Sequence, residues 1–435
     1  MLKWIEIMPS GALNGSVKVP GSKNSSLALL AASCMADGPV RLQGIPDLFD
    51  IKVIQGIFQD IGVSMTRQGR DLIIDPGSIA SSDLDIDKTS AFRASYYFVG
   101  ALLAKQKKVR IGYPGGDDFV SRPIDQHFKA LKALGANIEL KDTYYIVEAE
   151  RLVGTDIFFD VITSGATINA LLASARASGT TVLRNAATDP EVVDTANMLN
   201  QMGARIRGAG TSTIRVEGVK ELSGCTYSVI PDRLIAGAFL LSAAATRGTV
   251  TVEGAIPDHL GSFLSKMEEI GVGIEINEQK ITAHGDVRLK AVRVRTGMYP
   301  GFATDLQQPL TPVLLRAHGK SIITERVYPK RFNHVQQLNR MGANIEVKGP
   351  SAWISGTQTL QGALVHASDV RAGVSLIIAG LMAEGSTAIT GVEHVERGYE
   401  DIIGSFSALG AKLALKQGGR LEGEQAYWLK NAARK

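Results

Sequence analysis

The chain has 435 residues, 45% of them hydrophobic, and this exceeds what a single core usually organises, so two domains are expected. Its net charge of +4 comes from Lys and Arg residues scattered along the chain, which excludes the dense basic stripe of a nucleic-acid-binding protein and favours a small anionic partner. No stretch approaches the roughly 18 consecutive apolar residues of a membrane-spanning helix, so no membrane association is expected.

The N-terminal segment and the cysteines point to a cytoplasmic protein. Residues 1–20 alternate apolar and polar side chains, which predicts a strand rather than a signal peptide. Cys34 and Cys225 match none of the paired spacings of a zinc site, and we assign a role to neither. Cys34 lies in an apolar run and is interpreted as a small core residue. Free cysteines without a disulfide framework fit a reducing compartment.

An internal repeat is the most informative feature of the sequence. In each copy a helix ends at a glycine that precedes a strand, and these glycines are Gly62, Gly135, Gly203, Gly271, Gly342 and Gly410. Successive glycines lie 68 to 73 residues apart by subtraction, and a left-handed helix cap explains each one. Within each copy an apolar helix and then a strand precede this helix. We therefore predict an α/β fold of six helix-strand-helix-strand units, three per domain, with the apolar helices inside and the sheets outside.

Each predicted inner helix begins near a polar residue, and in chain order these are Lys23, Arg93, Ser164, Arg233, Asp305 and Arg371. Helix caps and solvated charges would explain Ser164 and Asp305. Helix capping and solvation explain the cations poorly, because a cation at a helix N-terminus interacts unfavourably with the helix dipole, at a cost of roughly 0.3–1 kcal/mol. A bound polyanion is therefore expected. A second set is expected on loops facing the same cleft: Asp50, Glu191, Arg331 and Arg397.

Several motifs carry a family resemblance, among them VPGSKNSSLALLAA, PGGDDFVSRPIDQH, PDRLIAGAF, TDLQQPLTP, SDVRAGVS and ERGYEDI. From about residue 8 to about residue 415 the chain resembles the UDP-N-acetylglucosamine enolpyruvyl transferases, or 1-carboxyvinyltransferases, of the enolpyruvyl transferase family. The resemblance implies a two-domain inside-out α/β barrel. Residues 22–229 would form the domain with the mobile loop, residues 1–21 and 230–435 the other, and the active site would lie between them.

The resemblance also implies an activity. The family transfers the enolpyruvyl group of phosphoenolpyruvate to the 3-hydroxyl of UDP-N-acetylglucosamine and releases phosphate, the first committed step of peptidoglycan synthesis, without a metal or organic cofactor. Cations that match donor-binding positions are Lys23, Arg122 and Arg397, with Arg371 assisting. Asp305 matches the base that takes the acceptor's hydroxyl proton, and Asp369 matches a carboxylate implicated in proton handling.

Further positions match acceptor contacts, namely Asn24, Arg93, Tyr97, Arg122, Pro123, Ile124, Asp125, Gln126, Thr163, Ser164, Gly165, Val327 and Arg331. Tyr97 stands where many relatives have Trp. An aromatic face is preserved, although packing within the inner helix explains Tyr97 equally well.

Asp117 occupies the loop position at which most relatives carry a reactive cysteine. We interpret it as the general acid, because a cleft can raise a carboxyl pKa enough for it to donate a proton. The alternative is a solvated loop carboxylate. Without the cysteine thiolate, the chain is expected to resist fosfomycin, an epoxide that alkylates that thiolate.

Two other departures concern the acceptor: Val161 stands where relatives usually have Lys, and Ile235 where they usually have Glu. They leave open a paralogue that uses another uridine nucleotide or, less favoured, shikimate 3-phosphate. A non-catalytic metabolite-binding protein is a third alternative. The two aspartates Asp305 and Asp369 argue against it, because binding alone would not need them.

Overall fold

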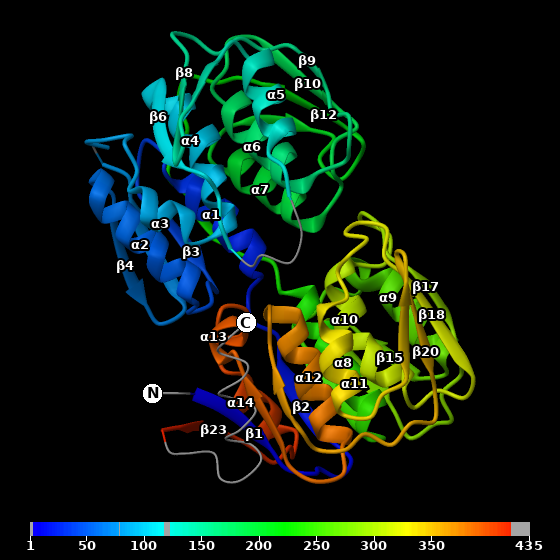
Figure 1. Cartoon of the computed structure of the whole chain (residues 1–435). Helices are drawn as coiled ribbons and strands as arrows, with labels where there is room; N and C mark the ends of the chain where they lie inside the picture. Colours follow the sequence, from blue (N-terminus) through cyan, green and yellow to red (C-terminus); the bar gives the residue numbers. More distant parts are fainter. Residues whose placement is uncertain (1–2, 78, 117–121, 419–435) are drawn as a thin grey trace. The chain divides into compact units, whose positions relative to one another are not determined.

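The computed structural model describes residues 3–77, 79–116 and 122–418. The chain divides into two compact units, each with its own hydrophobic core (Figure 1). Pro20–Asp232 forms one, called here the middle unit, and the described parts of Met1–Val19 and Arg233–Lys435 form the other, called the terminal unit. No helix among the described residues is long and apolar enough to cross a membrane.

The described strands of the middle unit form short sheets, one wholly antiparallel and the others mixed. Their orders are β13 (Thr226–Ser228), β3 (Val40–Gln43), β5 (Asp71–Asp75), β4 (Ser64–Gln68); β6 (Lys108–Gly112), β8 (Tyr144–Glu148), β7 (Asn137–Leu140); and β11 (Arg205–Arg207), β12 (Thr213–Glu217), β10 (Thr180–Arg184), β9 (Asp156–Phe158). Both β3 and β10 have a parallel neighbour on one side and an antiparallel neighbour on the other. Figure 1 shows β9, β10 and β12 beside α6.

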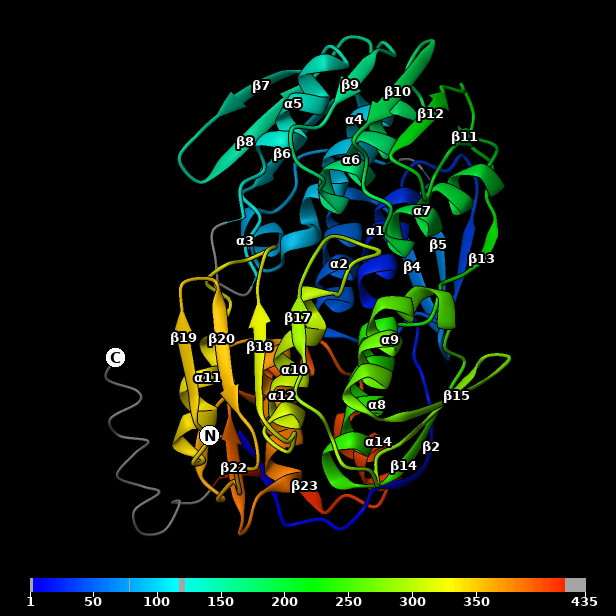
Figure 2. The same ribbon diagram turned by 90° about the vertical axis from the view of Figure 1, so that its right-hand side faces the viewer.

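The terminal unit is also built from short sheets. Its described sheets run β21 (Leu364–His366), β22 (Thr387–Thr390), β1 (Lys3–Ile7), β23 (Leu413–Gln417); β15 (Gly273–Asn277), β16 (Lys280–His284), β14 (Thr249–Glu253), β2 (Asn14–Lys18); and β17 (Arg293–Arg295), β18 (Lys320–Thr324), β20 (Ser351–Ser355), β19 (Ile345–Lys348). Figure 2 shows the last four strands side by side. The predicted N-terminal strand is confirmed, since Ile5 of β1 pairs with Ile389 and Leu415.

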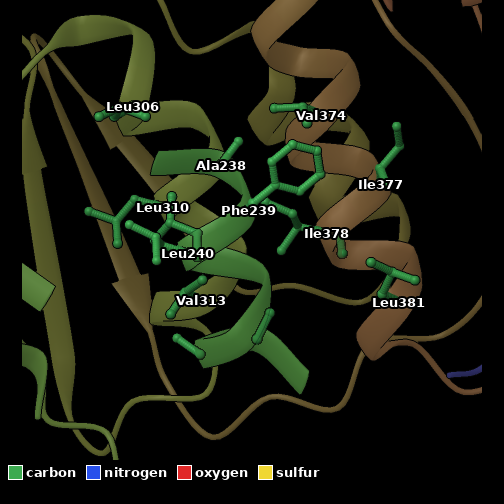
Figure 3. Close-up of a cluster of buried hydrophobic side chains, with 14 of the residues drawn as sticks. Ala238, Phe239, Leu240, Leu306, Leu310, Val313, Val374, Ile377, Ile378 and Leu381 are labelled. Carbon is green, nitrogen blue, oxygen red and sulfur yellow. The ribbon is translucent and has the colours of Figure 1, made fainter. Parts of the chain in front are cut away.

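Buried helices fill the middle of each unit. In the middle unit they are α1 (Lys23–Ser33), α4 (Tyr97–Gln106) and α6 (Ser164–Ser174), and in the terminal unit α8 (Arg233–Thr246), α10 (Thr304–Leu314) and α12 (Val370–Met382). Most of their residues are buried, as helices apolar on nearly every face require. In Figure 3, Phe239 of α8 lies beside Val374 of α12, and Leu240 lies beside Leu310 of α10. Truncating Phe239 to Ala would lower the free energy of unfolding by about 3–5 kcal/mol.

The remaining longer helices are half-buried, namely α2 (Phe49–Ile61), α5 (Asp125–Ala133), α7 (Pro190–Gln201), α9 (Gly261–Ile270), α11 (Asn333–Arg340) and α14 (Ile402–Ala408). The glycines at their C-terminal ends are all left-handed, which confirms that prediction: φ is 85°, 99°, 104°, 106°, 91° and 93° at Gly62, Gly135, Gly203, Gly271, Gly342 and Gly410. Short helical turns complete the fold at α3 (Ile86–Ser90), η1 (Arg93–Tyr96), η2 (Pro257–Leu260) and α13 (Val392–Glu396).

One placement made from the sequence is wrong. Asp50 and Glu191 were expected on loops, but they lie in the first turns of α2 and α7. For α7 the reason is local, because Pro190 occupies the first helical position, where its fixed φ favours helix initiation and its missing N–H costs no hydrogen bond.

Candidate active site

In the terminal unit, Asp305 of α10 lies between two guanidinium groups. Arg331 donates from Nη1 to Oδ1 of Asp305 at 2.5 Å, and Arg371 donates from Nε to Oδ2 at 3.1 Å. The side chain of Asp305 is 26% exposed, against 4% for Arg331 and 10% for Arg371. The carboxylate therefore reaches solvent while its two partners are held in the protein. Charge-assisted pairs of this kind are among the stronger hydrogen bonds.

This setting controls the protonation of Asp305. Burial alone would raise the pKa of its carboxyl, but the positive charges of Arg331 and Arg371 outweigh burial and hold the pKa well below its usual range. Asp305 is consequently ionised at any physiological pH. It can accept a proton, but its basicity is weak for as long as both guanidiniums remain paired with it.

Arg331 is fixed at both its backbone and its side chain. The side-chain amide of Gln307 donates from Nε2 to the carbonyl oxygen of Arg331 at 2.6 Å. The guanidinium donates from Nη1 to Oγ1 of Thr304 at 3.1 Å and lies 5.8 Å from the ring centre of Tyr328. These contacts orient the guanidinium toward Asp305.

Asp369 caps the N-terminus of α12. Its Oδ1 accepts hydrogen bonds from the backbone amides of Arg371 at 2.9 Å and Ala372 at 3.0 Å, and the residue is 1% exposed. An N-cap carboxylate satisfies amides at the start of a helix and complements its dipole. Asp369 thus fixes where α12 begins, and with it the position of Arg371.

The other expected site residues of this unit lie at the ends of helices or in a turn after a strand. Arg397 is the C-cap of α13 and is half-buried. The amide of Val327 donates to Oε1 of Glu325 at 2.8 Å in the turn after β18. Arg233 is the first residue of α8, and its guanidinium lies 5.4 Å from the ring centre of Tyr299.

In the middle unit, Lys23 is the first residue of α1. Its Nζ lies 2.8 Å from Oδ2 of Asp50, whose side chain is only 3% exposed, and its backbone amide donates to Oδ2 of Asp232 at 3.1 Å. Ser22 caps the helix by accepting from the amide of Ser25. Asn24 is exposed. A lysine at a helix start is therefore tolerated because a buried carboxylate balances its charge.

The structure brings Arg93 and Arg122 together. Arg93 donates from Nη2 to the carbonyl oxygen of Arg122, and its guanidinium lies 5.8 Å from the ring centre of Tyr96. Pro123 is exposed and Ile124 is half-buried. The segment from Arg122 to the start of α5 is thus anchored to η1.

Gln126 ties the same segment to the loop before α6. Its Oε1 accepts from the amide of Asp160 at 2.9 Å, and its Nε2 donates to Oδ2 of Asp125 at 2.8 Å. Thr163 is the N-cap of α6, and Ser164 is its first residue. Predicted acceptor contacts from two separate motifs therefore lie on neighbouring segments of the middle unit.

Tyr96 and His127 were not singled out in the sequence, yet both adjoin Gly165. A Cβ atom on Gly165 would come within 2.7 Å of Tyr96 Oη and 3.2 Å of His127 Nε2, so the close packing of these elements requires glycine. Burial, reinforced by Arg93, lowers the pKa of His127 to about 3, which keeps the imidazole neutral. No motif pointed to this contact, because its members come from three different elements.

Tyr97 itself lies in the hydrophobic core. It is 6% exposed and meets the Tyr96 ring edge-on, with ring centres 4.8 Å apart. Burial raises the pKa of its hydroxyl well above the ordinary value. This placement fits the packing interpretation of Tyr97.

Comparison with known proteins places the chain. A family model described as EPSP synthase (3-phosphoshikimate 1-carboxyvinyltransferase) matches residues 7–406. The chain belongs to this family. UDP-N-acetylglucosamine 1-carboxyvinyltransferase 2 of Geobacillus kaustophilus (strain HTA426) is 46% identical over 428 residues, 98% of this chain and 99% of that protein. The protein of the same name from Staphylococcus aureus (strain MRSA252) is 47% identical over 410 residues, 94% and 98% of the two chains.

Solved structures share the fold. The enolpyruvyl transferase NikO from Streptomyces tendae matches with a TM-score of 0.88 at 24% identity, over 96% of this chain and all 100% of that one. EPSP synthase from Acinetobacter baumannii matches with a TM-score of 0.74 at 20% identity, over 95% and 100%. The α/β enolpyruvyl transferase fold expected from the sequence is confirmed at this level.

The positions at which this enolpyruvyl transferase departs from its family's pattern have different surroundings. Val161 is 58% exposed and lies two residues before Thr163, the N-cap of α6. Ile235 of α8 is 4% exposed and lies in the hydrophobic core of the terminal unit, where apolar side chains are favoured. Asp117 lies outside the described residues.

Proposed function

We propose that this chain transfers the enolpyruvyl group of phosphoenolpyruvate to the 3-hydroxyl of UDP-N-acetylglucosamine and releases phosphate, the first committed step of peptidoglycan synthesis. The observation that carries the proposal is the 46% identity, over 98% of the chain, to a relative whose name states this acceptor. We further propose that each unit contains three copies of the repeated helix-strand-helix-strand unit in an inside-out barrel, and that the enzyme works in the cytoplasm.

The donor is a small dianion or trianion, and four cations are proposed to hold it: Lys23, Arg122, Arg371 and Arg397. Phosphate and carboxylate groups pair well with guanidinium and ammonium groups in a site from which water is excluded. Lys23 and Arg371 are already held by the carboxylates Asp50 and Asp305, which supports their being positioned in advance of binding. Such preorganisation is the main source of electrostatic catalysis.

Asp305 is proposed as the base that removes the proton of the attacking hydroxyl. Its depressed pKa makes it a weak base in the unliganded protein. An incoming anion competes with Asp305 for the guanidiniums of Arg331 and Arg371, so substrate binding would loosen their hold and raise the basicity of the carboxylate. The base would thus become effective once the substrates are in place.

Asp117 is proposed as the acid that protonates the methylene carbon of phosphoenolpyruvate, on the basis of its position in the sequence motif. Asp369 is proposed to assist proton handling. Its Oδ1 is engaged by two backbone amides. Its Oδ2, which accepts from Ser368 Oγ at 3.4 Å, is the oxygen better placed to exchange a proton.

The acceptor is proposed to contact residues that match the family's acceptor-binding motifs. Arg93, Asn24 and residues 163–165 would bind the sugar and the diphosphate, and residues 122–126 would lie along the uracil, whereas Tyr97 packs in the hydrophobic core. Val327 and Arg331 would contact the sugar portion. The hydrogen bonds from Arg93 to Arg122 and from Asp160 to Gln126 support the grouping of these acceptor contacts within the middle unit.

A second acceptor remains a candidate because of one observation. Val161 places an exposed apolar side chain where relatives usually have a lysine near the diphosphate. Phosphate release, measured with phosphoenolpyruvate and a panel of acceptors, separates the two. Turnover with UDP-N-acetylglucosamine and not with uridine diphosphate sugars of other configuration or shikimate 3-phosphate supports the proposal, and turnover with none of them contradicts it.

A further inference from the structure

Glu325, which the sequence did not single out, carries a dense set of hydrogen bonds beside Asp305. The residue follows β18 and is 0% exposed. Its Oε1 accepts from Oγ1 of Thr296 at 2.6 Å and from the backbone amides of Val327 at 2.8 Å and Tyr328 at 2.9 Å. Its Oε2 accepts from Oγ1 of Thr304 at 2.8 Å. One buried carboxylate therefore ties a strand end, a turn and the start of α10 together.

The Thr304 bond is directional. A hydroxyl has one proton to donate and two lone pairs to accept with, and a carboxylate only accepts. Thr304 therefore gives its proton to Glu325 and presents a lone pair to Nη1 of Arg331, which lies 3.1 Å away. The same Nη1 donates to Oδ1 of Asp305 at 2.5 Å. The hydrogen bonds run in sequence from Arg331 through Thr304 to Glu325.

We propose that Glu325 and Thr304 are positioning residues for acceptor binding: Glu325 orients the Thr304 hydroxyl, and Thr304 holds the Arg331 guanidinium in the place from which it binds the acceptor. Glu325 also fixes the amide of Val327, a second proposed acceptor contact. This inference rests on the proposed function, in which Arg331 and Val327 contact the acceptor.

A purely structural role for Glu325 predicts something different, and the chain offers a matched control. Thr296 is 2% exposed and donates its hydroxyl proton to the same carboxylate as Thr304 does. Its hydroxyl accepts from the amide of Arg326 at 2.8 Å rather than from the guanidinium of Arg331. Thr296→Val and Thr304→Val each remove one hydroxyl that donates a hydrogen bond to Glu325. Only Thr304→Val also removes a hydrogen-bond acceptor of the Arg331 guanidinium.

The kinetic test measures kcat and the KM values of both substrates for the wild type, Thr304→Val, Thr304→Ser and Thr296→Val. Thermal unfolding of each variant serves as the folding control. Thr304→Val should raise the KM for UDP-N-acetylglucosamine about tenfold or more, the scale of a charged hydrogen bond, and leave the KM for phosphoenolpyruvate within about twofold. Thr304→Ser keeps the hydroxyl and should restore the wild-type KM. Thr296→Val should lower the unfolding temperature similarly with little change in either KM.

Equal changes of KM in Thr304→Val and Thr296→Val, or no rescue by Thr304→Ser, would overturn the positioning role. Crystal structures of the two valine variants test it without any substrate. The Arg331 guanidinium should move away from Asp305 in Thr304→Val and stay in place in Thr296→Val, and an unmoved guanidinium in Thr304→Val would refute the inference. Absence of turnover in the wild type would contradict the proposed function, and these two structures would still decide the positioning role.

Discussion

Arg331 and Asp305, 26 positions apart in the sequence, form an ion pair in which Nη1 lies 2.5 Å from Oδ1. The pairing links the proposed base to a proposed acceptor-binding cation. Arg371 completes the arrangement on the other carboxylate oxygen. A carboxylate held between two guanidiniums can be released when an anionic substrate competes for them.

Replacing Asp305 with Asn should remove most of the activity without unfolding the protein. An amide cannot accept the hydroxyl proton, and general bases contribute about 10²–10⁴-fold to rate, so kcat should fall by at least about 100-fold. The isosteric side chain still fills the site and still accepts from Arg331. Phosphate release gives the rate and circular dichroism the fold. A variant with near-wild-type kcat would remove Asp305 from the role of base.

Asp305 should also contribute to stability in a pH-dependent way. Its pKa is lower in the folded protein than in the unfolded chain, so its ionisation stabilises the fold above the unfolded pKa of about 3.9. The stability difference between wild type and Asp305→Asn should be constant from about pH 5 to 8 and should shrink as the pH falls below about 4. Urea unfolding at a series of pH values measures it. A difference that grows on acidification would show that the folded pKa is raised instead.

Lys23→Ala should impair both donor use and stability, because the lysine balances the buried carboxylate of Asp50. Loss of the ammonium from this pair should cost about 1–3 kcal/mol in the free energy of unfolding. The double variant Lys23→Ala/Asp50→Asn should recover much of that stability while the KM for phosphoenolpyruvate stays high. Arg397→Ala should raise the same KM. If the double variant regained normal donor kinetics, Lys23 would be a structural residue only.

The enzyme should resist fosfomycin, because position 117 carries Asp where an alkylated cysteine stands in most relatives. A carboxylate is a much weaker nucleophile than a thiolate, so mass spectrometry should find no adduct after prolonged exposure. Asp117→Cys should become sensitive and remain active, whereas Asp117→Asn should be nearly inactive because an amide cannot supply the proton. An adduct on the native chain, or an active Asp117→Asn enzyme, would contradict this reading.

The sequence predicted much of the fold because its signals are local. Helices commonly end at a residue in the left-handed conformation, and all of the glycines chosen for that reason, such as Gly62 and Gly342, adopt it. Helix starts were predicted for the same reason, with Lys23 and Ser164 as first helical residues. The placement of Asp50 on a loop failed because propensity alone does not locate a helix boundary to within a residue or two.

The site was predicted less completely, because its contacts join residues that are far apart in the chain. Asp305 and Arg331 were both named from the sequence, but nothing in either motif indicates that they form an ion pair. Glu325 was missed, since a single glutamate after a strand looks like any solvated loop charge until its burial is known. His127 was missed because its neighbours Tyr96 and Gly165 come from other elements of the chain.

This chain is proposed to transfer the enolpyruvyl group to UDP-N-acetylglucosamine. The most direct test incubates the purified protein with phosphoenolpyruvate and UDP-N-acetylglucosamine and follows both inorganic phosphate and the mass of the nucleotide sugar. One phosphate should be released for each UDP-N-acetylglucosamine that gains an enolpyruvyl group, and Asp305→Asn should form neither product at a comparable rate. Phosphate release without a modified nucleotide sugar, or no phosphate release at all, would contradict the proposed transfer.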